Sequence, residues 1–218
     1  MKNLLVLFLF LNMVFLSLSC EDTDKRDDSN VLAGEQSEMG KVGVTVTSSS
    51  AEIAGVSNAS AVVDNLENGI SSYSAQATVT NDILKNMIAN FPGVLIDGDN
   101  VSVENLQIQQ TTGGIKCITG PDSGILINYN SNVGDTYPIG STGRVRTVVS
   151  KTGVDDYPYG FYLIKTIQVE SNRLGLRSAT GVSKITYIAN HKFGMVGVKV
   201  TFTDGSSAIF PVYSSTQN

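Results

Sequence analysis

A strict two-residue alternation near the C-terminus most constrains what this chain can fold into. From residue 196 to residue 202 every second position is apolar, and an Asp-Gly pair follows at 204–205. Alternate side chains of a strand point to opposite faces, and Asp-Gly favours the tight turn of a β-hairpin. We therefore predict a half-buried strand over 196–202 that turns back into a second strand over 208–212. The inward residues of the first strand are Val196, Val198, Val200 and Phe202.

Similar alternations indicate that most of the chain forms antiparallel strands. Segments 94–96 and 101–108 flank an Asp-Gly-Asp-Asn turn, which predicts a hairpin. The apolar phase shifts between Val103 and Leu106, so we expect a β-bulge near residues 104–105. From Gly124 onward the pattern is that of a β-meander. Further strands are expected over 42–47 and 75–79, and around three shorter alternations: Ile125 and Ile127; Val145, Thr147 and Val149; and Ile185 and Tyr187. A longer strand is expected to carry Phe161, Leu163, Ile167 and Val169 on one face.

One segment has the spacing of a short amphipathic helix. Its apolar stripe lies within residues 82–91, Thr80 or Asn81 is placed to cap its N-terminus, and Pro-Gly at 92–93 ends it. Residues 48–72 stay ambiguous, because helical spacing of apolar residues there is opposed by Gly69 and many serines.

The low share of charged residues supports a β-rich fold. Only 16% of the residues are charged, and the polar remainder is mostly Ser, Thr, Asn and Gln, which favour strands and loops over helix surfaces. We expect a mainly β fold, either an antiparallel sandwich or a curved sheet with one or two short helices. It is assigned to a single domain over residues 41–218, with two subdomains that meet near 120–125 as the alternative.

The N-terminus has the pattern of an export signal. Lys2 precedes an apolar run from Leu4 to Leu16, which suits a signal-peptide core and is too short to span a bilayer. The stretch Ser17-Leu18-Ser19-Cys20 resembles a bacterial lipobox, although Ser17 replaces the usual Leu and Leu18 is larger than usual. The resemblance implies a signal peptide over 1–19 and a diacylglyceryl group on Cys20, which would tether the protein to a membrane.

An acidic stretch follows this cysteine. Residues 21–28 contain Glu21 and four aspartates, and residues 20–40 are predicted to be a lipidated flexible tether. The stretch is similar to the surface-export signal of lipoproteins of Bacteroidota. That similarity implies anchoring in the outer membrane, facing the cell surface or otherwise the periplasm. A merely solvated tether is the alternative interpretation.

The second cysteine, Cys117, would be alone if Cys20 carries a lipid. Its neighbours Ile115 and Ile118 indicate a buried small hydrophobe. A disulfide between Cys20 and Cys117 is the alternative for an exported domain.

Charge and motifs exclude several function classes. The net charge of −5 and the lack of a basic cluster argue against nucleic-acid binding. The single histidine, His191, cannot build a histidine-rich metal site and is expected in an exposed turn. Asp97 and Asp99 are weak metal candidates whose residue types suit a hairpin turn equally well. Asp155-Asp156 is expected in a solvated turn, and no catalytic residue or cofactor is predicted.

Tyrosines are the most suggestive side chains. Tyr157, Tyr159 and Tyr162 crowd one loop, and Tyr137 lies in another. Exposed tyrosines stack on sugars or anchor protein partners, whereas packing over the end of a sheet is the alternative. We therefore expect a non-catalytic binding module for a protein or glycan partner. A structural subunit of an envelope assembly and a hydrolase are the other hypotheses.

Overall fold

The computed structural model describes residues 31–89, 91–120, 122–172 and 181–217, which form two large antiparallel sheets, a separate two-stranded hairpin and one α-helix. The expected mainly β fold is therefore confirmed. The signal peptide, Cys20 and the acidic stretch lie outside the described residues.

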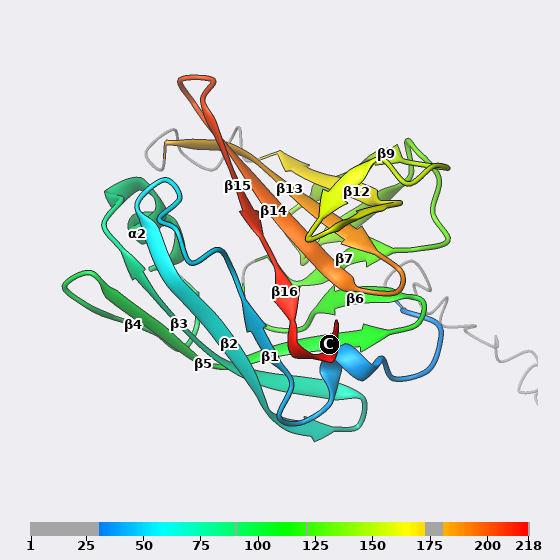
Figure 1. Cartoon of the computed structure of the whole chain (residues 1–218), viewed down its shortest axis with the longest axis horizontal. Coiled ribbons are helices and arrows are strands. Elements are labelled where there is room, and N and C mark those ends of the chain that lie inside the picture. The colour runs from blue at the N-terminus through cyan, green and yellow to red at the C-terminus, as the bar shows by residue number, and fades with distance from the viewer. Residues whose placement is uncertain (1–30, 90, 121, 173–180, 218) are drawn as a thin grey trace, which may run out of the picture.

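The larger sheet, sheet A, curls into a half-barrel (Figure 1). Its strands are ordered β16-β1-β2-β3-β5-β6-β7, and β4 pairs with β5. The strands are β1 (Thr45–Thr47), β2 (Val56–Glu67), β3 (Ile70–Val79), β4 (Val94–Asp97), β5 (Asn100–Thr111), β6 (Gly114–Cys117), β7 (Gly124–Asn128) and β16 (Tyr213–Ser214).

The second sheet, sheet B, has the order β15-β14-β13-β12-β9-β8. Its strands are β8 (Thr136–Ile139), β9 (Arg144–Lys151), β12 (Ile167–Asn172), β13 (Val182–Asn190), β14 (Gly194–Phe202) and β15 (Ser207–Pro211). A separate hairpin between β9 and β12 consists of β10 (Tyr157–Tyr159) and β11 (Tyr162–Ile164).

The two sheets share one core and approach each other at both sides. At one side the chain passes from β15 in sheet B through Val212 into β16 in sheet A. At the other side β7 lies beside β8, and the Gly140 amide donates to the Ser123 carbonyl. Buried side chains of both sheets, among them Ile127 and Val169, belong to one apolar cluster.

The helix α2 (Asp82–Ile88) begins where the sequence predicts and ends one turn early. The Asn81 side chain accepts hydrogen bonds from the amides of Ile83 and Leu84, which satisfies two free donors of the first turn. A 3-10 turn, η2 (Glu38–Gly40), precedes the sheets, and a second, η4 (Ser215–Gln217), follows β16.

Several strand predictions are confirmed, including β4–β5, β13 and β14–β15. The bulge on β5 is also where the phase shift predicts it: Tyr73 pairs with Leu106 and Ala75 with Val103, while Asn105 takes a φ of 57°. The ambiguous segment 48–72 contributes to a long hairpin of β2 and β3 rather than a helix.

Three expectations are wrong. Segment 161–169 is two strands, and Phe161 is fully exposed because it lies at the turn of the β10–β11 hairpin. In β9 the inward residues are Arg146 and Val148, while Val145 and Val149 face outward. The tether is shorter than predicted, because Leu32 and Met39 are buried and the Gln36 backbone bridges to Thr111.

Candidate functional site

Small side chains hollow the inner face of sheet A. β2 and β3 place alanines inward at positions where a packed core would carry Val, Leu or Ile. The opposing strands β14 and β15 present Val198, Val200 and Phe210, which do not reach across to fill the space. The inward alanines are Ala59, Ala61, Ala75 and Ala77.

The resulting cleft between the two sheets has a volume of about 500 Å³ and walls made almost entirely of carbon. Ligand-binding pockets commonly measure about 300–1,000 Å³. Water inside such a cleft finds few hydrogen-bond partners, so an apolar molecule that displaces it gains free energy. The cleft therefore has the size and chemistry of an apolar binding site.

Helix α2 forms one wall of this cleft. Leu84, Met87 and Ile88 point into it, and Phe91 and Pro92 extend the same wall after the helix. Leu84 also packs with buried residues of both sheets. The helix is short, so its stability depends on these tertiary contacts.

A smaller space of about 190 Å³, which we call the inner cavity, adjoins the cleft and extends toward Met39 and Gln110. At its far end the Tyr73 hydroxyl donates to the Met39 carbonyl at 3.3 Å and accepts from the Gln110 side-chain amide. Burial raises the pKa of Tyr73 to about 12, so its hydroxyl stays protonated at neutral pH. Four residues line both spaces, and we call them the neck: Val46, Ala61, Leu106 and Val212.

No charged side chain lines either space in the part of the chain that the structure describes. An ionised group placed inside would lose its hydration without gaining a counter-charge, which is strongly unfavourable. The arrangement therefore suits a neutral apolar group.

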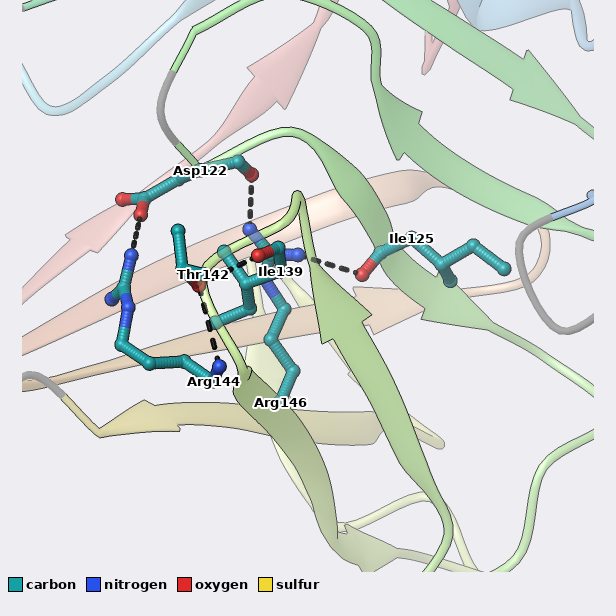
Figure 2. Close-up of polar contacts among 6 residues, drawn as sticks. All are labelled: Asp122, Ile125, Ile139, Thr142, Arg144 and Arg146. Atoms are coloured by element: carbon teal, nitrogen blue, oxygen red, sulfur yellow. Dashed lines mark hydrogen bonds and ion pairs between the residues drawn. The ribbon is translucent and has the colours of Figure 1, made fainter.

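The most polar buried cluster lies at the β7–β8 side and is structural in character (Figure 2). Arg146 of β9 is fully buried and donates to the backbone carbonyls of Ile125 and Asp122. Arg144 forms an ion pair with the Asp122 carboxylate at 2.8 Å. Since Arg146 has no exposed surface, a solute has no access to it. The cluster fastens sheet B to sheet A.

The four tyrosines singled out in the sequence do not share one surface. Tyr137 and Tyr159 are buried, and the Tyr159 hydroxyl donates to the Val212 carbonyl at 2.8 Å. Tyr157 is half-buried, and its hydroxyl lies near Gly197. Tyr162 is 70% exposed and stands next to the exposed Phe161.

The remaining candidates lie apart. Asp97 and Asp99 are exposed in the β4–β5 turn, where Asp99 pairs with Lys85 at 2.8 Å. His191 is exposed in the β13–β14 turn, and Asp155-Asp156 is exposed before β10. Within the described ranges, no group of three or more His, Cys, Asp or Glu residues is placed to hold a metal ion.

Cys117 is a free thiol buried in the shared core, as its apolar neighbours predict. Burial raises the pKa of this thiol, which keeps it protonated and poorly nucleophilic.

Sequence reasoning missed the cleft residues. A signal was present, because alanines occupy alternate positions at 59, 61, 75 and 77, in phase with the buried Val63, Tyr73 and Val79 of the same strands. It became informative only once β2 and β3 were known to be strands that face a second sheet.

Comparison with known protein families, curated proteins and solved structures finds no match for this chain. Over the described residues, no helix has the length and apolar character needed to cross a membrane.

Proposed function

We propose that this chain is a lipid-anchored envelope protein that binds an apolar ligand, without catalysis, in the cleft between its two sheets. The observation that carries the proposal is the carbon-walled space of about 500 Å³. Each ~100 Å² of ligand surface moved from water into it contributes about 2.5 kcal/mol. The envelope location rests on the sequence pattern around Cys20.

A fluorescent apolar probe tests the proposal. N-phenylnaphthylamine is titrated into the chain carrying Cys20→Ala, a form expected to need no detergent. In that background Ala77→Trp fills the cleft from β3 and should weaken probe binding about tenfold or more, or ~1.4 kcal/mol. The matched control is Thr78→Trp, whose ring points to the other face of the same strand.

Two results would contradict the proposal. One is the absence of saturable probe binding to the parent chain. The other is an equal loss of affinity in Ala77→Trp and Thr78→Trp while both variants melt as the parent does, because a probe in the cleft must distinguish the two faces of β3.

A second candidate function is contact with a protein partner through the β10–β11 hairpin. Phe161, Tyr162 and Leu163 are all more than half exposed and adjacent at its turn. Exposed aromatic side chains are common anchors of protein interfaces. The segment 157–164 contains no charged residue that would oppose desolvation on binding.

A further inference from the structure

We propose that the ligand is a single unbranched acyl chain that enters through the cleft and passes the neck tail-first into the inner cavity. This inference rests on the proposed function, since it names the class of ligand for the same site. It is carried by the alignment of the two spaces along one strand.

β5 lines both spaces with one continuous inward face. Val101 and Val103 line the cleft, Leu106 lines the neck, and Ile108 and Gln110 line the inner cavity. Strict alternation would turn Leu106 outward after Val103. The bulge at residues 104–105 restores the phase and keeps the apolar face inward along the whole strand.

The length of this path suits one acyl chain. At ~3.3 Å per residue, and with one residue taken up by the bulge, the run from Val103 to Ile108 alone covers about 13 Å. That is about half the ~30 Å hydrocarbon thickness of a bilayer, which is the depth that one acyl chain fills.

The neck selects a slender ligand. Its four side chains come from β1, β2 and β5 of sheet A and from the β15–β16 connection that joins the two sheets. Interior side chains of a folded protein are close-packed and give way only at a cost in free energy. A linear chain fits such a passage, whereas a fused ring system fills the wider cleft and stops there.

The walls favour an acyl chain over an apolar peptide. A peptide brings one amide and one carbonyl per residue, and each loses free energy when buried without a partner. The cleft walls offer almost no polar surface to satisfy them. At the end of the inner cavity the Tyr73 hydroxyl is already hydrogen-bonded to Met39 and Gln110. It therefore needs no polar partner from the ligand, and the methyl end of an acyl chain can lie against it.

Chain-length dependence of binding tests the inference. Saturated fatty acids from octanoic to stearic acid displace N-phenylnaphthylamine from the Cys20→Ala chain. Affinity should rise about fourfold per methylene, the equivalent of ~0.8 kcal/mol, until both spaces are filled, and then level off.

Two variants of opposite effect locate the path. Ala61→Phe narrows the neck, so affinity should level off at a shorter chain length than in the parent. Met195→Ala enlarges only the inner cavity, so affinity should level off at a longer chain. Met195→Ala keeps the test decisive if Ala61→Phe does not fold, and thermal melting identifies that case.

The outcomes separate this inference from the proposed function. The probe could bind while the parent protein, Ala61→Phe and Met195→Ala all show the same dependence of affinity on fatty-acid length. In that case threading through the neck is wrong, and the cleft still binds apolar ligands. If an oligoleucine peptide displaces the probe and fatty acids do not, the acyl assignment is overturned. If no probe binds at all, the proposed function fails as well.

Discussion

At the scale of single residues, Arg146 is the clearest departure from what its type predicts. A charged residue between Val145 and Thr147 is expected to face water, which led to the wrong inward face for β9. The structure buries it because two backbone carbonyls accept its guanidinium protons and the Tyr187 ring lies 5.8 Å away. These carbonyls belong to β7 and to the turn before it, so the sequence near Arg146 carries no sign of them.

We predict that Arg146→Ala lowers the free energy of unfolding by about 3–5 kcal/mol. The substitution leaves the Ile125 and Asp122 carbonyls without their donor and opens a void at the sheet junction. Val145→Ala, one residue away and 46% exposed, should cost under ~0.5 kcal/mol. Urea unfolding of both variants measures the difference. Similar losses would mean that the arginine does not join the sheets.

At the scale of elements, strands with large alternating residues could be predicted and strands with small ones could not. β14 and the β4–β5 hairpin follow directly from Val, Ile and turn residues, and even the β5 bulge follows from a phase shift. β2 was missed because Ala and Ser dilute its alternation, and these same small residues hollow the cleft. The feature that creates the site therefore also weakened the signal for its strand.

The β10–β11 hairpin carries the element-scale prediction. A photoreactive phenylalanine analogue in place of Tyr162 should form a crosslink to one partner protein when intact cells are irradiated. The substitution Phe161→Ser should abolish this crosslink, because it removes the adjacent aromatic anchor. Stability should change little, because Phe161 is fully exposed. The same label at Val149, exposed on sheet B, is the control. An adduct that survives Phe161→Ser, or that forms equally at Val149, would count against a partner at this hairpin.

At the scale of the whole molecule, the cleft exists only through contacts between distant parts of the chain. Its walls run from Val46 in β1 to Val212 beyond β15, with α2 between them in sequence. Local periodicity assigns a face to each strand but not which faces meet, so neither the cleft nor the neck could be predicted. The sequence pointed instead to the loop with Tyr157, Tyr159 and Tyr162, because a cluster of aromatic residues can be recognised locally whereas a space between two sheets cannot.

The membrane anchor and the cleft should act as separable parts of the molecule. The proposed diacylglyceryl group on Cys20 would supply two acyl chains, which is enough for stable anchoring, while residues that line the cleft begin at Val46. We therefore predict that Cys20→Ala abolishes metabolic labelling with palmitate and moves the protein from the membrane to the soluble fraction. Cys117→Ala, which removes the other thiol, should keep both the label and the membrane location. An unmodified Cys20 in the mass spectrum of the mature protein, or a Cys20→Ala chain that stays with the membranes, would refute the lipid anchor and leave the cleft to be judged on its own binding data.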